Sequence, residues 1–347
     1  MKLLLHTISF IFSTAIVWCI GQLFCSSLLV LEYNPRLNKY IYACDNEYHQ
    51  RYEGWATTKI GHYGVNAVPD ITAIKGDKIA VWGDSYVEAY HVNDQFKTPC
   101  VVNTLFENKG IKLFCYGVAI SGNSIADYYY DIPKYDKLVS NTIAHYIVIT
   151  SPEDVLPNQP ADVAYGVYMS DPYRLEISSW KPKHQSTKKL FKKYGFGFLW
   201  EPSRKLLTET SLDFLPHVVS ESTIPHDKRC SMVSSMDIGP SINFILAKLK
   251  KQTDKKIVLA YCPKIPYLEN GQVVTQKKDT EFSLLLMSAA QASGIDFIDL
   301  SEHFVRFYRA SNKFPRGFHN SKPGEGHFNR HGHRLVAERI VYSIINE

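Results

Sequence analysis

A serine and a histidine in this sequence stand in settings that suit acyl transfer. Ser85 directly follows an apolar run, in the stretch KIAVWGDSYVEAYHV at 78–92. A serine at such a strand-to-helix turn has its hydroxyl at the sheet edge and its backbone N–H at a helix N-terminus, where negative charge is favoured. G-D-S is also ordinary turn chemistry. The stretch alone therefore leaves two interpretations open, a nucleophile or a polar turn residue.

The histidine lies near the C-terminus, in GEGHFNRHGHRLVAERI at 324–340. A general base needs a neutral imidazole that one acceptor holds in a single tautomer and that reaches the serine oxygen. We expect His327 to be this base and Glu325, two residues earlier, to supply the acceptor. The alternative is that His327 caps the following helix or only forms hydrogen bonds with backbone groups of its loop. His331 and His333 show that histidine is common here.

Five short apolar runs separated by helix-length segments must position these residues. Unalternating runs of this kind are typical of parallel strands buried on both faces, and their spacing suits crossover helices. We therefore expect an α/β fold, with functional residues just after the strands, at their carboxyl ends. The runs are Lys78–Trp82, Lys112–Tyr116, His145–Thr150, Lys256–Cys262 and Asp296–Asp299.

The N-terminus indicates a membrane span, because Leu3–Val30 is almost uninterrupted apolar sequence. About 20 residues cross the hydrocarbon core, so the stretch is long enough. A cleaved signal peptide is the main alternative, although the run is long for one and neither an A-x-A site nor a lipobox is evident. Lys2 precedes the span while Arg36 and Lys39 follow it, so the charges do not favour a cytoplasmic N-terminus. Because the span nevertheless has the character of a start signal for export, we expect a single-pass membrane protein whose body is extracytoplasmic, and periplasmic in a Gram-negative cell.

The sequence predicts three regions. Residues 1–31 are an anchor or uncleaved signal, residues 32–76 a juxtamembrane lead-in without sustained period, and residues 77–347 the catalytic domain, with an insert at about 158–239. Within the insert, residues 181–205 carry eight Lys or Arg against one acid, with aromatic residues between them. This segment suits contact with anionic lipid headgroups or an acidic glycan. It is equally typical of a basic solvated helix with an aromatic underside.

Composition narrows the function classes. The net charge is +5, and the sequence has no continuous Lys/Arg tail, so a nucleic-acid partner is poorly supported. No C-x-x-C and no Cys/His spacing suggests zinc, so we expect no metal. Cys115 and Cys262 lie in apolar runs and are expected to be small core residues. Cys44, Cys100 and Cys230 could include one disulfide, which the sequence does not pair.

Taken together, the motifs resemble those of the SGNH/GDSL hydrolase superfamily over residues 77–347. VWGDSYVEAY is similar to the family's first block, which implies that Ser85 is the nucleophile and one oxyanion donor. YGVAISGNSIADYY resembles the second block, which implies a backbone donor at Gly122. IVITSPEDV falls where the third is expected, and HFNRHGHRLVA resembles the fourth, which implies that His327 is the base. The resemblance implies a three-layer α/β/α, flavodoxin-like parallel sheet.

The sequence departs from the family pattern at two positions. Where the third block normally presents an Asn that donates to the oxyanion, this chain has Glu153, within S-P-E-D. An ionised carboxylate repels an oxyanion, and losing one donor costs on the order of 3 kcal/mol. Glu153 is therefore protonated, or points elsewhere, or is replaced by Asn123. The family's Asp three residues before the histidine is Gly324 here, and the spacing of Glu325 resembles the alginate-type O-acetyltransferase branch.

The resemblance implies acyl transfer without a cofactor: a covalent acyl-Ser85 intermediate whose acyl group passes to water or to a sugar hydroxyl. The span and the basic insert favour an acylated cell-envelope glycan as substrate, with envelope polysaccharide machinery as a partner. One alternative is a weakened domain that binds glycan or scaffolds an envelope assembly. A lipase or thioesterase is a further alternative.

Overall fold

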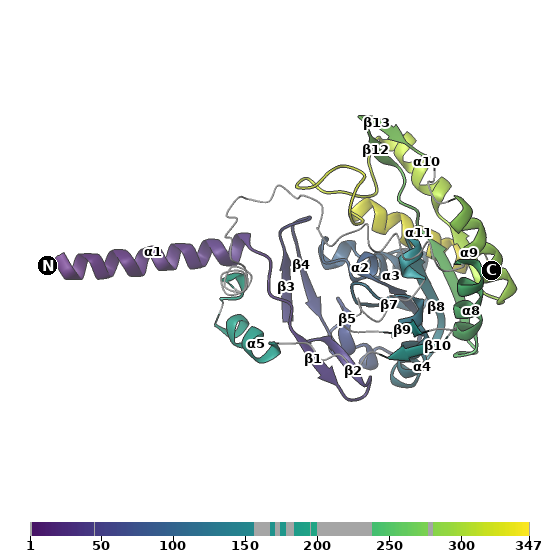
Figure 1. The fold of residues 1–347 in the computed structure, drawn as a ribbon, viewed down its shortest axis with the longest axis horizontal. Helices are drawn as coiled ribbons and strands as arrows, with labels where there is room; N and C mark the ends of the chain where they lie inside the picture. The colour runs from purple at the N-terminus through teal and green to yellow at the C-terminus, as the bar shows by residue number, and fades with distance from the viewer. Residues whose placement is uncertain are drawn as a thin grey trace.

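The five apolar runs form the parallel part of one eight-stranded sheet in a computed structural model of the chain (Figure 1). The structure describes residues 2–44, 46–155, 167–170, 174–177, 184–194, 196–199, 238–276 and 280–346. The parallel strands are β6 (Asp77–Gly83), β7 (Leu113–Ala119), β8 (Thr142–Ile149), β11 (Lys256–Tyr261) and β14 (Asp296–Asp299). Their spatial order is β7-β6-β8-β11-β14. Counted along the chain this is 2-1-3-4-5, the flavodoxin-like order, so the expected fold class is confirmed.

Helices cover both faces of the sheet, as the three-layer expectation requires (Figure 1). One core cluster joins the sheet to three helices, and the other joins its opposite face to three more. Because apolar side chains fill both interfaces, the parallel strands read as continuous apolar runs. The first set is α4 (Ile125–Leu138), α8 (Ile238–Lys250) and α9 (Thr280–Ala292); the second is α3 (Thr98–Lys109), α10 (Ser301–Ser311) and α11 (Arg330–Ile345).

The expected lead-in is also part of the sheet. Beyond β7 the sheet continues through three antiparallel strands, β5, β4 and β3. The sequence of these strands shows little hydrophobic alternation, and there is a physical reason. Buried and more exposed residues do alternate along β4, but one buried position is the polar Thr58. Its hydroxyl accepts a hydrogen bond from the buried Lys97 ammonium at 2.9 Å. The elements before β6 are β1 (Leu31–Asn34), β2 (Lys39–Tyr42), β3 (Asn46–Gln50), β4 (Ala56–Ile60), η1 (His62–Gly64), β5 (Val65–Asn66) and η2 (Ile71–Ala73).

The N-terminal helix α1 (Lys2–Phe24) projects from one side of the body (Figure 1). Its window Leu4–Gly21 has a mean hydropathy of 1.8 and is 6% buried, which makes it long and apolar enough to cross a bilayer. A signal sequence near an N-terminus meets the same criteria.

The remaining described elements are short connections and part of the insert. Within the described residues Cys44 and Cys100 form no disulfide, and Cys115 and Cys262 are buried, while Cys230 lies outside those residues. Most of the basic segment 181–205 also lies outside them, apart from its helix α5 and the turn η5. These elements are α2 (Ser85–Glu88), η3 (Asp94–Phe96), η4 (Pro152–Asp154), β9 (Val167–Ser170), β10 (Arg174–Ile177), α5 (Gln185–Lys193), η5 (Gly197–Leu199), β12 (Tyr267–Glu269) and β13 (Gln272–Val274).

Candidate active site

Ser85 is the first residue of α2, directly beyond the carboxyl end of β6. The turn is tight, because a Cβ at Gly83 would lie 2.3 Å from the Val87 side chain. Asp84 caps α2 by accepting a hydrogen bond from the Tyr86 N–H at 2.9 Å. Since β6 lies between β7 and β8, Ser85 stands where the order of the parallel strands reverses, the usual ligand position in such sheets.

His327 reaches this serine from the loop before α11: its Nε2 lies 2.9 Å from the Ser85 Oγ. The Tyr86 hydroxyl donates to the Gly326 carbonyl at 3.1 Å, and its ring lies 5.0 Å from the His327 ring. After the loop, Asn329 caps α11 by accepting from the His331 N–H at 2.9 Å. The chain on both sides of the imidazole is therefore held in place.

A buried cation that sequence reasoning missed attaches this loop to the sheet. Arg316 is 1% exposed and donates to the carbonyls of Cys262 and Pro263, at 2.9 and 2.7 Å, just after β11. Its guanidinium also lies over the rings of Tyr86 and Phe328, at 5.5 and 5.2 Å. A lone arginine in a loop gives no sequence signal of such burial.

The carboxylate on the His327 ring is that of Glu53, and this corrects the expectation for Glu325. One Glu53 oxygen lies 2.7 Å from the His327 Nδ1, and the other accepts from the His327 backbone N–H at 2.7 Å. Glu325 instead faces Lys322 at 3.5 Å and is 48% exposed. Its neighbour Gly326 has a φ of +71°, and a Cβ there would lie 2.1 Å from a Glu53 oxygen. The glycine turns the chain and leaves the space that Glu53 fills.

The turn that carries Glu53 is clamped by the histidine loop itself. Asn320 accepts from the Gly54 N–H at 2.8 Å and donates to the carbonyls of Arg51 and Gly54, at 3.2 and 3.1 Å. Gly54 has a φ of +74°, and a Cβ there would lie 2.2 Å from the His91 carbonyl oxygen. The only sequence signal for this arrangement is a glycine after an acid, which is too common to select Glu53.

Electrostatics keep Glu53 ionised. Burial raises its pKa, but the hydrogen bonds and charge of His327, with the charge of His91, hold the pKa below its ordinary value. A carboxylate only accepts, so the His327 Nδ1 carries the hydrogen and Nε2 is left to accept the proton of Ser85. This is the tautomer that a general base needs.

A second histidine stacks on the first. The rings of His91 and His327 have centroids 3.8 Å apart and planes 14° apart, and the His91 Nε2 lies 3.6 Å from a Glu53 oxygen. Burial, with a smaller effect from the His327 charge, lowers the pKa of His91 to about 3, so it is neutral at neutral pH. One ligand atom from each of Glu53, His91 and His327 lies within 4.8 Å of the other two, a spacing that could also hold a metal ion.

Two backbone N–H groups, one at Ser85 and one in the loop after β7, are candidate oxyanion donors. Within the described residues, neither the Ser85 N–H nor the Gly122 N–H has a hydrogen-bond acceptor. Gly122 follows β7, the neighbour of β6, and has a φ of +83°. The Ser121 N–H donates to the Glu88 carboxyl at 3.0 Å, which ties this loop to α2. Asn123, next along the loop, is 8% exposed, and its side chain bonds to no described residue.

The third expected block forms η4, just after β8. Glu153 is half-buried there, and its part in the oxyanion site stays a prediction. Asp154 has a structural role, because it accepts from the Thr150 N–H and hydroxyl at 2.5 and 2.9 Å, and from the Ser151 N–H at 3.1 Å. Burial raises the pKa values of Asp154 and Asp84, and the charge of Asp154 raises that of Asp84 further.

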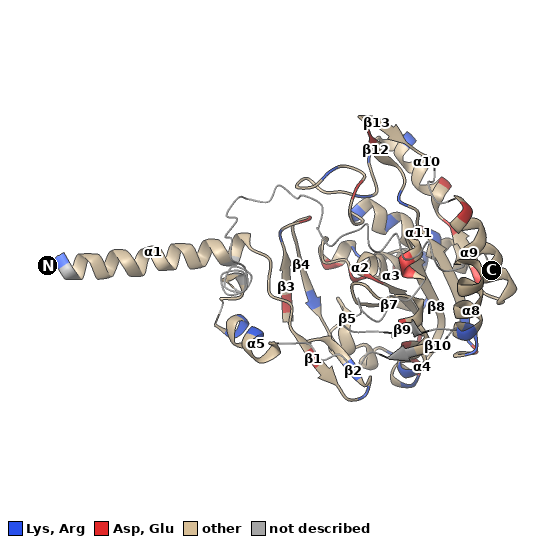
Figure 2. Ribbon diagram, viewed as in Figure 1, with Lys and Arg blue, Asp and Glu red and all other residues tan. Residues whose placement is uncertain are grey.

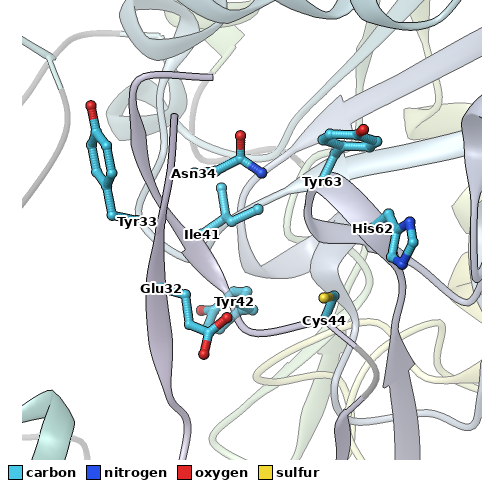
Figure 3. Close-up of a pocket in the computed structure, with 8 residues that line it drawn as sticks. All are labelled: Glu32, Tyr33, Asn34, Ile41, Tyr42, Cys44, His62 and Tyr63. Carbon is cyan, nitrogen blue, oxygen red and sulfur yellow. The ribbon is translucent and has the colours of Figure 1, made fainter. Parts of the chain in front are cut away.

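A separate cavity of about 180 Å³ lies beside the β1–β2 hairpin. Figure 3 shows that the Glu32 carboxylate, the Cys44 thiol and the His62 imidazole are among the groups that line it. None of the lining residues is Ser85, His327 or Glu53, so it is distinct from the candidate active site.

No protein-family model and no curated protein sequence matches the chain. Solved structures that resemble it include an acetyl xylan esterase, with 16% identity, coverage of 77% of this chain and 99% of that one, and a TM-score of 0.39. Another is a member of the lipolytic protein G-D-S-L family from Veillonella parvula, with 11% identity, coverage of 78% and 100%, and a TM-score of 0.40. A third is the periplasmic domain of a lipopolysaccharide acetyltransferase from Salmonella ser. Paratyphi A, with 11% identity, coverage of 79% and 86%, and a TM-score of 0.37.

Proposed function

We propose that this protein is a serine-dependent acyl-ester hydrolase or O-acyltransferase that works through an acyl-Ser85 intermediate. The observation that carries the proposal is the continuous chain of contacts from the Ser85 Oγ to the His327 Nε2, at 2.9 Å, and from the His327 Nδ1 to Glu53, at 2.7 Å. A nucleophile, a base and an acid that orients the base are the parts that acyl transfer by serine needs.

The mechanism follows from these contacts. Ser85 attacks the ester carbonyl while His327 takes the hydroxyl proton, and Glu53 stabilises the imidazolium that forms. His327 then returns the proton to the departing alcohol, which leaves the acyl group on Ser85. Water or a sugar hydroxyl, deprotonated by the same imidazole, attacks the acyl-serine and releases the enzyme.

The oxyanion is stabilised in this proposal by the backbone N–H groups of Ser85 and Gly122, which have no other acceptor within the described residues. The Asn123 side chain is a candidate third donor, because it is nearly buried and bonds to no described residue. Glu153 fills this role only when protonated, so we assign the donor to Asn123.

We infer an acylated cell-envelope glycan as the substrate. The support is contextual: α1 suits a membrane anchor. We infer that the body lies on the extracytoplasmic side of that membrane. On the same inference, the acyl acceptor is a hydroxyl of that glycan or water. Envelope polysaccharide machinery would then be the partner that supplies an acyl donor. A lipase or thioesterase with this site would act on acyl-chain esters without any gain from a glycan.

The second candidate is a weakened domain that binds glycan or scaffolds an envelope assembly. The observation in its favour is Glu153, a carboxylate where a donor is expected. Such a domain would bind acetylated polysaccharide without releasing acetate.

The test is acetate release by the full chain in nanodiscs, from O-acetylated polysaccharide and from p-nitrophenyl acetate, with Ser85→Ala as the control. The proposal predicts release from both substrates that Ser85→Ala abolishes, and faster release from the polysaccharide. Equal release by wild type and Ser85→Ala would contradict it. Binding of the polysaccharide without release, in both proteins, would establish the scaffold function instead.

A further inference from the structure

The end of α1 packs against the turn that carries Glu53. The Arg51 guanidinium donates through Nε to the Leu23 carbonyl at 3.1 Å, and the Phe24 ring meets the Trp55 ring edge-on at 5.7 Å. Arg51 also lies 4.4 Å above the Trp55 ring. The turn 51–55 is therefore attached to the point where α1 leaves the body.

The basic helix α5 lies on the segment that follows α1 (Figure 1). Gln185 accepts a hydrogen bond from the Leu31 N–H at 2.9 Å, and Lys189 pairs with Glu32 at 2.6 Å. A cavity of about 340 Å³ lies between the two segments. It is lined on one side by residues 25–29, Tyr52 and Tyr90, and on the other by Lys188 and Gly197.

Exposed apolar side chains are concentrated near the point where α1 leaves the body. Six of the twelve large hydrophobic residues that are exposed in the described part of the chain outside α1 belong to the turn 51–55 or to α5 and η5 and the residues between them. Exposed aromatic residues beside a membrane helix are typical of side chains at the headgroup level. The six are Tyr52, Trp55, Leu190, Tyr194, Phe196 and Leu199.

The charges that α5 adds to this surface are positive. Figure 2 shows blue stretches of the ribbon on α5, which carries Lys188, Lys189, Lys192 and Lys193 and no acid. The Lys192 ammonium is buried 3.7 Å above the Tyr48 ring, so the exposed cations of α5 are Lys189 and Lys193. Cations interleaved with aromatic residues suit a surface of anionic lipid headgroups.

We propose that this exit surface, made of Phe24, the turn 51–55 and residues 185–194 and 196–199, lies in the headgroup layer of the anionic bilayer that α1 crosses. The inference rests on α1 being a membrane span, as in the proposed function. It deepens that function, because Glu53 is the middle residue of the turn. Its Cα is then within about 7 Å of that of Trp55, since a residue spans at most about 3.5 Å. Ser85 would thus act on an acyl ester presented at the membrane surface.

The first test uses the five tryptophans of the full chain in nanodiscs that contain phosphatidylglycerol and lipids brominated near the headgroup. The proposal predicts that Trp55→Phe lowers the fraction of fluorescence that the bromolipid quenches. Trp82, which is fully buried in the core, is the matched control, and Trp82→Phe should raise that fraction. An unchanged quenched fraction in Trp55→Phe would overturn the proposal.

The second test places the photoreactive residue p-benzoylphenylalanine at Tyr194, with Tyr342 as the matched control because the two tyrosines are 58% and 55% exposed. We expect several-fold more lipid adduct from position 194 than from 342, and more in phosphatidylglycerol than in phosphatidylcholine. Equal adducts at both positions, or no preference for the anionic lipid, would overturn the proposal. Both tests measure lipid contact and neither measures turnover. A failure of the proposed enzymatic function, which acetate release tests, is therefore distinguishable from a failure of the membrane proposal.

Discussion

Glu53 binds His327 with both carboxylate oxygens, one on the ring Nδ1 and one on the backbone N–H, each at 2.7 Å. The two residues are 274 positions apart in the sequence. The backbone bond holds the Glu53 carboxylate beside the loop, and the imidazole cannot turn away from Ser85 without breaking its own bond to that carboxylate. The orienting acid therefore comes from the N-terminal extension of the sheet and not from the histidine loop.

Replacing Glu53 with Gln should lower kcat/KM for an acyl ester by roughly 10³–10⁴-fold, because an amide stabilises neither the tautomer nor the imidazolium. Steady-state kinetics with p-nitrophenyl acetate would measure the effect. Glu325→Gln is the matched control, since Glu325 contacts Lys322 and is half exposed. If Glu325→Gln were the variant that lost activity, the assignment of Glu53 would be wrong.

Asn320 positions Glu53 and touches no reacting atom. Asn320→Ala removes three hydrogen bonds to the turn at Arg51 and Gly54, so we expect about a 10- to 100-fold loss in kcat with little change in KM. Asn320→Asp keeps the acceptor for the Gly54 N–H and should lose less. A rise in KM alone, at constant kcat, would speak against a positioning role.

Gly326 leaves the space for the Glu53 carboxylate, so Gly326→Ala should displace it. The control is Gly294→Ala, which has a similar positive φ of +65° but no atom within 4 Å of the added Cβ. Both variants carry about 1–2 kcal/mol of backbone strain, which denaturant titration would measure. Only Gly326→Ala should also lose esterase activity; equal activity in the two variants would refute the steric argument.

Glu88 makes stability depend on pH. Burial raises its pKa from 4.5 to about 7. Below the unfolded value both states hold the proton, and between the two values only the folded state holds it. The free energy of unfolding therefore falls as pH rises through this window, by about 3 kcal/mol in total, at 1.4 kcal/mol per pH unit.

Glu88→Gln removes this dependence while keeping an acceptor for the Ser121 N–H. Denaturant titrations of both proteins at pH 5 and pH 8 would measure the difference. The variant should lose less stability than wild type over that interval. The same loss in both proteins would show that Glu88 does not titrate in this range.

The sheet was predictable and the orienting acid was not. Four of the five parallel strands, β6, β7, β8 and β11, are largely buried and appear as apolar runs, whereas β14 at the edge is partly exposed. Ser85 lies just beyond β6. Strands β3 to β5 are short, and Lys97 meets an inward Thr58, so local pattern does not reveal that they belong to the sheet. Glu53 and His91 reach His327 only because this extension and the histidine loop meet, a contact that no local pattern encodes.

The most direct test of the account is the reaction of the full chain with a fluorophosphonate, followed by intact mass and peptide mapping. The account predicts one adduct, on the Oγ of Ser85, that is absent in Ser85→Ala. It also predicts that labelling is lost in His327→Ala, because no base then takes the serine proton. Failure of the folded wild-type protein to label at Ser85, or undiminished labelling in His327→Ala, would contradict the proposal that Ser85 is an activated nucleophile.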